Sequence, residues 1–426
     1  MDFYMYYLVF VFRISDFNFL YNYLCSVIIL YDYICTQNKS LNFLIFVIVF
    51  KIYISDYNCV TPLGFDVASN WEALQNNQSG IRRHKIARNS GEIFASVIDN
   101  AELDDFWEKN FGEKKFTRFE KMLIISLKPI VEKNPVSEKS ILILSTTKGN
   151  ISEIRNQTSA PETAFLFHSA QKIADFFGFE TKPIVVSNAC VSGVMAVSVG
   201  KTLLESGQYE NAYILAGDEV TEFVISGFKS FQAMSSELCK PYDKNRSGIT
   251  IGEASAALFL TKEKSDFKIL GTASVNDANH ISGPSRTGEG LFKSISNALK
   301  EAEILPEKID YISAHGTATL YNDEMEAIAF NRLKMNQIPI NSLKAYYGHC
   351  LGASGLLEII IALESSKNST LIATKNFEKI GVSQPLNIIE KNQQKQIQTF
   401  LKTASGFGGS NSAIVIRKTH PNGKNL

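Results

Sequence analysis

The sequence predicts an α/β protein with a mainly parallel or mixed sheet. Short apolar runs such as ILILSTT (141–147) and NAYILAGDE (211–219) have the length and composition of buried strands. Helical segments, several of which end at a glycine, alternate with these runs along residues 51–419. Such alternation of strands and helices is typical of α/β folds.

The expected elements follow one another with short connections. In the first part we predict strands at 51–57, 141–147, 182–189, 211–219 and 254–260, with helices at 66–76, 161–178 and 190–207. In the second part we predict a strand at 267–275, a strand that runs into a polar turn at 309–319, a strand and loop at 339–349, and a glycine-rich turn with a final strand within 403–418. Helices are predicted at 288–304 and 350–366. Asp66 is a typical N-cap residue, and Gly178 and Gly207 are typical helix ends.

The polar segment TKEKSD (261–266) predicts a boundary between two halves near residue 262. We expect an N-terminal half over 51–262, a C-terminal half over 263–419 and a tail over 420–426. The segments SNACVSGVMAVSVGKTLL and YYGHCLGASGLLEIIIAL share one design: a strand, a reactive type of residue, then a helix that begins with small residues. This similarity suggests a duplicated α/β unit whose two helices pack together at one central site.

Composition limits the classes of partner. The 426 residues include 43 basic and 43 acidic side chains, so the formal net charge is zero and no nucleic-acid partner is expected. Six cysteines form neither CxxC pairs nor a metal-binding spacing, and they are too few for a disulfide scaffold. We therefore expect a reducing compartment, the cytoplasm.

Residues 1–50 differ from the rest, because Phe, Tyr, Ile and Leu crowd them and polar residues interrupt every long apolar run. Three alternatives remain open: a membrane anchor, an added segment packed on the domain, and non-native upstream sequence joined through a misplaced start. The bias toward Phe, Tyr, Ile and Asn is typical of translated AT-rich DNA and favours the third. We expect this extension to lie outside the catalytic fold and a membrane to be involved only if it is genuine.

Cys190 stands between an apolar strand and a helix start. A helix N-terminus favours a thiolate, and its free N–H groups can stabilise an oxyanion, as covalent acyl transfer requires. The alternative is a small buried hydrophobic residue. His315 and His349 each follow an apolar segment and lie next to a glycine, so both are expected at strand ends that face a cleft.

Several motifs together carry a family resemblance. They are VTPLG (60–64), NACVSG (188–193), KPYDKNRSGITIGEASAALFL (240–260), AHGTAT (314–319) followed by Asn322 and Asp323, KAYYGH (344–349), LGASGLLE (351–358) and GFGGSN (406–411). From about residue 51 to 419 the chain resembles β-ketoacyl-acyl-carrier-protein synthases of the elongating Cys–His–His type. The resemblance implies a thiolase-like fold with two duplicated halves and buried central helices, in an α-β-α-β-α layering.

The resemblance also implies roles for individual residues. Cys190 is the nucleophile, His315 and His349 bind the malonyl thioester carbonyl, and Lys344 and Glu358 support their hydrogen-bond network. Phe407 and Gly408 provide the gate and oxyanion turn, and Thr317 and Thr319 contact the pantetheine arm. The alternative for Lys344 and Glu358 is an ion pair that only joins two segments. The alternative for Thr317 and Thr319 is a pair of ordinary turn hydroxyls. No metal or organic cofactor is implied.

The implied partners are acyl- and malonyl-loaded acyl carrier proteins and a second copy of the chain, with a heterodimer as the alternative. Carrier proteins are acidic, so a basic patch on one helical face is a candidate docking site, the alternative being a solvated basic face. The patch consists of Lys114, Lys115, Arg118 and Lys121, of which positions 114, 118 and 121 share the helical face.

Some stretches depart from the family pattern, among them STTKGN (145–150) and the two tyrosines of KAYYGH. They favour a specialised polyene, pigment or lipid pathway over ordinary fatty-acid elongation. The rival functions are a malonyl-carrier decarboxylase or acyltransferase on the same fold, and a non-catalytic partner subunit that resembles a chain-length factor. The presence of Cys190 argues against the non-catalytic subunit.

Overall fold

The computed structural model describes residues 9–12, 45–48, 50–85, 91–112, 115–154, 161–278, 283 and 285–419. The chain divides into two compact units, Met1–Lys51 and Ile52–Leu426. In the first unit β1 (Val9–Phe12) and β2 (Ile45–Ile48) pair as parallel strands. The other residues of the expected N-terminal extension, apart from Phe50, and the expected tail lie outside the described residues. Among the helices of the described ranges, none is long and apolar enough to cross a membrane.

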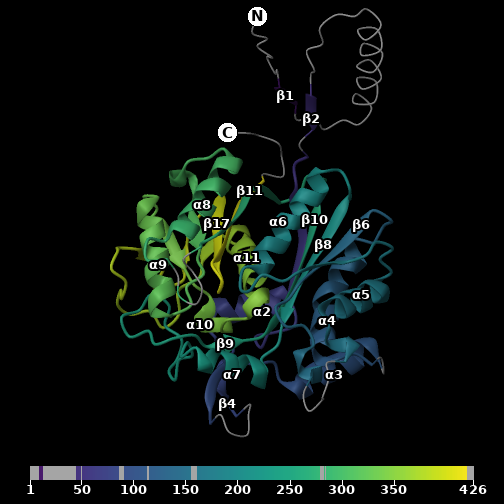
Figure 1. The fold of residues 1–426 in the computed structure, drawn as a ribbon, viewed down its shortest axis with the longest axis horizontal. Helices are drawn as coiled ribbons and strands as arrows, with labels where there is room; N and C mark the ends of the chain where they lie inside the picture. The colour runs from purple at the N-terminus through teal and green to yellow at the C-terminus, as the bar shows by residue number, and fades with distance from the viewer. Residues whose placement is uncertain are drawn as a thin grey trace, which may run out of the picture. The chain divides into compact units, whose positions relative to one another are not determined.

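The second unit is built on one mixed sheet, which has eleven strands in the described part of the chain (Figure 1). Its first half contains β3 (Tyr53–Val60), β6 (Ser140–Ser145), β7 (Ile184–Val186), β8 (Asn211–Asp218) and β10 (Ala254–Thr261). Its second half contains β11 (Phe267–Asn276), β12 (Tyr311–Ser313), β13 (Pro339–Asn341), β17 (Thr399–Ser405) and β18 (Ser410–Lys418), with β15 (Asn387–Ile388) at the edge beside β13.

The two halves repeat one topology. With strands numbered within each half, β15 left aside, both have the order 3-2-4-5-1, parallel between strands 3, 2 and 4 and antiparallel between strands 4, 5 and 1. The halves join where β11 pairs with β3 through Phe267 and Lys268. The predicted duplication is therefore confirmed. Residues 262–266 connect β10 to β11, and the sheet itself is continuous between the halves through β3 and β11, so the division of the chain near residue 262 remains a prediction.

Helices cover the two outer faces and lie between the halves (Figure 1). On the first half, α4 (Arg118–Lys133) packs on β3 and β10, and α5 (Leu166–Phe177) packs on β7. On the second half, α8 (Glu289–Ala302) packs on β11 and β18. The central helices α6 (Ser192–Glu205) and α11 (Ser354–Lys367) contact each other and strands of both halves. This is the predicted layering.

Further helices and short strands complete the fold, and β4, β5 and β9 form a small separate sheet. They are α2 (Val67–Gln75), α3 (Asn100–Phe111), α7 (Glu222–Ser230), α9 (Leu320–Arg332), α10 (Lys344–Tyr347), β4 (Ile81–His84), β5 (Ile93–Ser96), β9 (Ile251–Gly252), β14 (Thr370–Leu371) and β16 (Gln393–Gln394), with 3-10 turns at Ile151–Ile154, Glu162–Ala164, Pro306–Lys308 and Leu351–Ala353.

Helix ends agree with the expected capping residues. The Asp66 side chain accepts a hydrogen bond from the Ser69 N–H at 2.7 Å and so begins α2. Gly178 adopts a left-handed conformation (φ +75°) at the end of α5. Local sequence signals therefore located these two boundaries correctly.

Glycines allow the central helices to approach closely. A Cβ atom on Gly193 of α6 would lie 2.7 Å from the backbone nitrogen of Leu356 and 2.8 Å from the carbonyl oxygen of Gly352. A Cβ atom on Gly355 of α11 would lie 3.1 Å from the backbone nitrogen of Val194. These contacts involve backbone atoms, so a side chain here would push the two helices apart.

We expect Gly193→Ala to lower the free energy of unfolding by about 1–3 kcal/mol, because the added methyl group overlaps the backbone of α11. Urea unfolding measures the change. Gly227→Ala is the matched control, because Gly227 lies in helix α7 and its Cβ would meet nothing within 4 Å. That variant should gain up to about 1 kcal/mol from helix propensity. Equal midpoints for Gly193→Ala and the wild type would contradict the close packing.

Candidate active site

Cys190 lies in the turn between strand 3 of the first half and the central helix α6. Ala189, directly before it, has a φ of +44°, a left-handed conformation that turns the chain sharply. The Ser192 hydroxyl closes this turn: it accepts from the N–H of Asn188 at 2.7 Å and donates to the Ala189 carbonyl at 2.6 Å. The Cys190 side chain is therefore held at the helix start, where it is buried.

His349 has the corresponding place in the second half, between β13 and α11. Its Nε2 lies 3.1 Å from Cys190 Sγ, and its Nδ1 lies 3.0 Å from Ser354 Oγ. Its backbone N–H donates to the Thr250 carbonyl at 2.7 Å. Because a hydroxyl can donate or accept, Ser354 is able to hold either neutral tautomer of the imidazole.

His315 follows β12, which is strand 2 of the second half. Glu326 of α9 accepts from the backbone N–H of His315 at 2.8 Å and of Gly316 at 2.7 Å. Asp323 accepts from the Thr317 N–H at 3.0 Å. These two buried carboxylates fix the turn. The imidazole of His315 then lies edge-on to that of His349, with ring centres 5.2 Å apart.

The three predicted catalytic side chains converge. One reactive atom from each of Cys190, His315 and His349 lies within 4.8 Å of the other two. Burial, reinforced by the charge of Lys344, lowers the pKa of both imidazoles well below 6.5, so both are neutral at pH 7. Neutral imidazoles can each donate one N–H to a substrate oxygen without carrying a charge.

Burial opposes the effect expected of the helix start on the Cys190 thiol. Burial raises the pKa of this thiol to about 11 and outweighs the lowering effects of Lys344 and of a hydrogen bond from the Phe407 N–H. The thiol therefore keeps its proton at neutral pH until a base accepts it. His349 Nε2, at 3.1 Å, is placed to do so.

A buried row of charges lies close to the histidines. Lys344 forms an ion pair with one oxygen of Glu358, and Lys402 Nζ lies 2.6 Å from the other oxygen. All three side chains are almost fully buried. The structure thus brings the predicted Lys344 and Glu358 together and adds a second lysine that sequence reasoning missed.

A cavity of about 390 Å³ opens at Cys190, His315 and His349. Thr317 and Thr319 lie in its wall, with their hydroxyl oxygens 2.9 Å apart. The Thr319 hydroxyl also caps α9, where it accepts from the Asn322 N–H at 3.3 Å. These threonines therefore face the space that leads to the thiol, and they stabilise a helix start as well.

Phe407 lies in the cavity wall, in the glycine-rich turn between β17 and β18. Its ring centre is 5.7 Å from that of Phe231 and 5.8 Å from that of Phe228. A Cβ on Gly406 would lie 3.1 Å from the backbone nitrogen of Cys190, so this glycine lets the turn reach the nucleophile. Gly408 is exposed with a φ of +85° and shapes the turn without lining the cavity.

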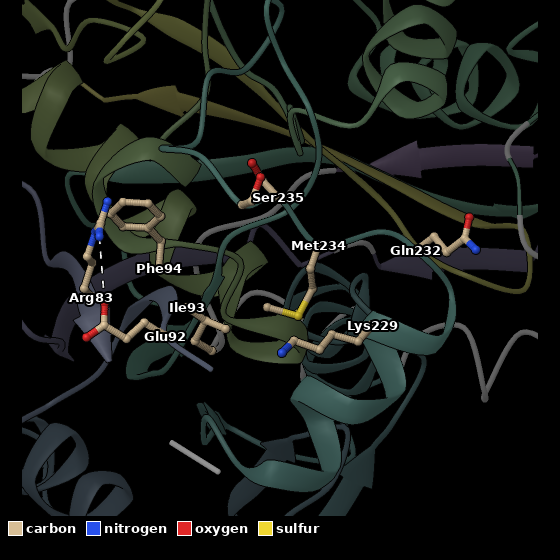
Figure 2. A pocket seen from close by; sticks show the side chains of 9 residues that line it. Arg83, Glu92, Ile93, Phe94, Lys229, Gln232, Met234 and Ser235 are labelled. Atoms are coloured by element: carbon tan, nitrogen blue, oxygen red, sulfur yellow. Dashed lines mark ion pairs between the residues drawn. The ribbon is translucent and has the colours of Figure 1, made fainter. Parts of the chain in front are cut away.

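A second cavity, of about 340 Å³, lies beside the first, since Gln232 lines both (Figure 2). The β4–β5 hairpin contributes Arg83 and Glu92, whose charged atoms are 3.8 Å apart, and α7 contributes Lys229. Arg83 and Lys229 are both exposed. Two cations therefore lie next to the space that leads to Cys190.

The helix expected to carry the predicted docking residues begins at Arg118. Thr117 forms a capping box with Glu120: its hydroxyl accepts from the Glu120 N–H, and the Glu120 carboxylate accepts from the Thr117 N–H. This motif starts α4 at Arg118, so Lys115 precedes the helix, and the shared face expected for positions 114, 118 and 121 remains a prediction. Lys114 is outside the described residues, and Lys115 is exposed before the helix.

The other two docking candidates already have carboxylate partners. Arg118 pairs with Glu253, with one N–O distance of 3.0 Å, and its side chain is 25% exposed. Lys121 Nζ lies 2.6 Å from Asp104 Oδ1. Docking by this patch therefore remains a prediction, and Lys115 is the described member of it without such a partner in the structure.

Sequence reasoning missed three residues that organise the site: Ser354, Glu326 and Lys402. Ser354 was interpreted only as one of the small residues of LGASG. Glu326 lies three residues after Asp323 and was not connected with the His315 turn. Lys402, in TFLKTAS, is a lysine inside an apolar strand, and that break in hydrophobicity was the available signal.

Comparison with known proteins identifies the family. Residues 141–266 match the family model "Beta-ketoacyl synthase, N-terminal domain", and residues 267–378 match "Beta-ketoacyl synthase, C-terminal domain". The 3-oxoacyl-[acyl-carrier-protein] synthase 2 of Coxiella burnetii is 26% identical over 425 residues, which cover 86% of this chain and 98% of that protein.

Two further relatives belong to polyketide and ketosynthase systems. The tetracenomycin polyketide synthase ketoacyl synthase alpha subunit of Streptomyces glaucescens is 30% identical over 261 residues, 57% of this chain and 61% of that protein. The solved ketosynthase ApeO, in complex with its chain length factor ApeC from Xenorhabdus doucetiae, has a TM-score of 0.78 at 27% identity and covers 87% of this chain and 98% of its own. With its thiolase-like fold and its two matched domains, the chain belongs to the β-ketoacyl synthase family of acyltransferases.

Proposed function

We propose that this protein is an elongating β-ketoacyl-acyl-carrier-protein synthase, which condenses an acyl chain with malonyl carrier protein and releases CO2. One observation carries the proposal: a cysteine thiol and two neutral imidazoles meet at the bottom of one cavity. A thiol supplies the nucleophile for acyl transfer, and paired neutral donors suit a developing enolate oxygen.

In the first step Cys190 Sγ bonds to the acyl carbonyl carbon, and the bond to the carrier's thiol breaks. The thiol proton passes to His349 Nε2, 3.1 Å away, and then to the departing carrier thiolate. The backbone N–H groups of Cys190 and Phe407 lie at the turn beside the sulfur and are our candidates for the oxyanion site.

In the second step a malonyl carrier occupies the cavity, and its thioester carbonyl accepts N–H hydrogen bonds from His315 and from the Nε2–H tautomer of His349. The imidazole reaches this tautomer by moving its proton from Nδ1 to Nε2, after which the Ser354 hydroxyl donates to Nδ1. The bond to the carboxylate breaks, CO2 leaves, and its electron pair forms an enolate that these donors stabilise. The enolate carbon attacks the acyl-cysteine carbonyl. Cys190 leaves as the thiolate and is reprotonated, which gives 3-ketoacyl carrier protein.

The rival functions have less support. A decarboxylase that does not condense acyl chains would need the two histidines. It would not need a thiol 3.1 Å from one of them. A non-catalytic partner subunit would need neither. The names of the relatives, 3-oxoacyl-[acyl-carrier-protein] synthase 2 and ketoacyl synthase alpha subunit, favour condensation.

The pathway is part of the proposal, either fatty-acid elongation or a specialised polyene, pigment or lipid pathway. The two tyrosines that suggested a specialised substrate do not support it directly. Tyr346 hydrogen-bonds Asn77 at 2.9 Å, and Tyr347 is buried, and neither is among the described residues that line the Cys190 cavity. Support for a specialised pathway comes instead from the polyketide and chain-length-factor systems of the relatives.

The test incubates the full-length protein with malonyl carrier protein and a panel of acyl carrier proteins, and measures the intact mass of the carrier. We expect a new 3-ketoacyl mass for at least one acyl donor, and the donor identifies the substrate class. Formation of acetyl carrier protein without any 3-ketoacyl product would support the decarboxylase function instead. No change of mass with any donor, alone or with a partner subunit, would overturn the proposal.

We propose that the carrier docks over the cavity of Figure 2, because Arg83 and Lys229 lie there beside the mouth of the active site. Arg83→Glu and Lys229→Glu are each expected to raise the KM for the carrier by about 3- to 10-fold with kcat unchanged, because a reversed charge repels an acidic partner. Lys115→Glu is the comparison variant for the patch predicted from sequence. A raised KM in Lys115→Glu alone would favour that patch.

We also propose a dimer, formed with a second copy or with a related subunit, in the reducing cytoplasm. Strand β7 is an edge of the large sheet, and Phe165 and Phe167 at the start of α5 are 47% and 66% exposed and stacked on each other. The described cysteines of the second unit are all free thiols, which suits a reducing compartment. Native mass spectrometry of the full-length chain should give a dimer mass, and Phe167→Glu should weaken it. A monomer that condenses acyl chains would contradict the dimer.

A further inference from the structure

Lys402 is fully buried in the middle of β17, where a lysine is costly to place. In the sheet its backbone lies between Ser313 of β12 and Ile414 of β18. An ammonium group is kept in such surroundings only if protein groups replace its water. The contacts of Lys402 therefore indicate what it does.

The ammonium group of Lys402 meets three oxygens, one in an ion pair and two in hydrogen bonds. Nζ lies 2.6 Å from Glu358 Oε2 and donates to the carbonyl oxygens of Ser313 at 3.2 Å and Ala314 at 3.0 Å. Ser313 is the last residue of β12, and Ala314 directly precedes His315. Lys402 thus connects the strand end that carries His315 to the central helix α11.

Glu358 receives a second lysine from the other histidine's segment. Lys344 stands five residues before His349, at the start of α10, and pairs with the opposite oxygen of the same carboxylate. One glutamate therefore joins the segment of His349 to the strand end of His315. The row Lys344–Glu358–Lys402 sets the separation of the two imidazoles.

We propose that Lys402 is a positioning residue for the CO2-releasing step, because it fixes the carbonyls before His315 and, through Glu358, the distance from that imidazole to His349. This inference rests on the proposed function of the site. Acyl transfer to Cys190 uses His349 and the turn at Phe407, which Lys402 does not contact. The two half-reactions should therefore respond differently to its loss.

Lys402 also affects the protonation of the two histidines, and this effect, like its positioning effect, favours CO2 release. The titratable and charged groups around the two imidazoles are Cys190, Tyr242, Asp323, Glu326, Lys344, Glu358 and Lys402. After burial and Lys344, the positive charge of Lys402 also lowers the pKa of both histidines. Removing this charge raises the pKa of both histidines, so they protonate, and lose their neutral form, at a higher pH than in the wild type.

The test compares Lys402→Met with the wild type in two separate assays. We expect CO2 release from malonyl carrier protein to fall about 10- to 100-fold, since a misplaced donor loses much of its effect. Formation of acyl-Cys190, read by intact mass, should change by no more than about threefold. The acid limb of the pH profile for CO2 release should move to higher pH.

Lys201→Met is the matched control, because Lys201 is also buried, is paired with Glu205 and Glu301, and lies in α6 away from the cavity. It should leave the ratio of the half-reactions and the pH profile unchanged. Equal losses in both half-reactions, or an unchanged pH profile, in Lys402→Met would overturn the inference. If Lys402→Met does not fold, the same two assays are made on Lys402→Gln. Wild-type protein that releases no CO2 would instead overturn the proposed function.

Discussion

Replacing Cys190 with alanine is expected to abolish 3-ketoacyl formation, with a loss of roughly 10⁴-fold or more, because no thiol remains to carry the acyl chain. Release of CO2 from malonyl carrier protein should continue within about tenfold of the wild-type rate, because it depends on donors from His315 and His349. Intact mass of the carrier measures both outcomes: the ketoacyl product disappears, and acetyl carrier protein takes its place.

Cys59→Ala is the matched control, since Cys59 is a buried free cysteine in β3. It should keep condensation, although it will lose some stability. A Cys190→Ala variant that still made ketoacyl carrier protein would exclude this cysteine as the nucleophile. Loss of CO2 release together with condensation would mean that the thiol takes part in both steps.

Replacing Glu358 with alanine is expected to lower the free energy of unfolding by about 3–5 kcal/mol, because it leaves two buried ammonium groups without their shared counter-ion. Urea unfolding, followed by the fluorescence of Trp71 and Trp107, measures the change. Condensation should fall as well, because the same carboxylate links the two histidine segments.

Glu205→Ala is the control for the loss of a salt bridge as such. Its partner Lys201 keeps Glu301 at 2.5 Å, and Glu205 is 24% exposed, so the expected loss is about 1 kcal/mol or less. A Glu358→Ala variant as stable as Glu205→Ala would contradict the view that the row Lys344–Glu358–Lys402 holds this part of the core together.

Local patterns predicted most of the fold. The apolar runs that became β6, β8 and β10 are long enough to be recognised alone, and Asp66 and Gly178 mark helix ends through their own backbone preferences. Lys115 was expected at the helix start but precedes α4, because the capping box at Thr117, which starts the helix, was overlooked. Helices α3, α7 and α9 were not predicted.

The site could be predicted only in part. Cys190, His315 and His349 were found because each stands at a recognisable junction between a strand and a turn or helix. Their protonation was not predictable, because burial in the folded chain decides it, and burial reverses the expected effect of the helix start on Cys190. Lys402 was missed because its partners, Glu358 and two backbone carbonyls, lie far from it in the sequence. Only the folded chain brings them next to a charge inside a strand.

The repeated halves have a consequence for biosynthesis of the chain. Cys190 and the histidine that takes its proton are 159 residues apart and belong to different halves. A nascent chain that has completed only its first half carries the nucleophile without a base or an enolate-binding pair. The active site is therefore assembled late in folding, in one step, when contacts between residues far apart in the sequence form. A chain that ends before His349 therefore lacks the histidine that lies 3.1 Å from the Cys190 sulfur.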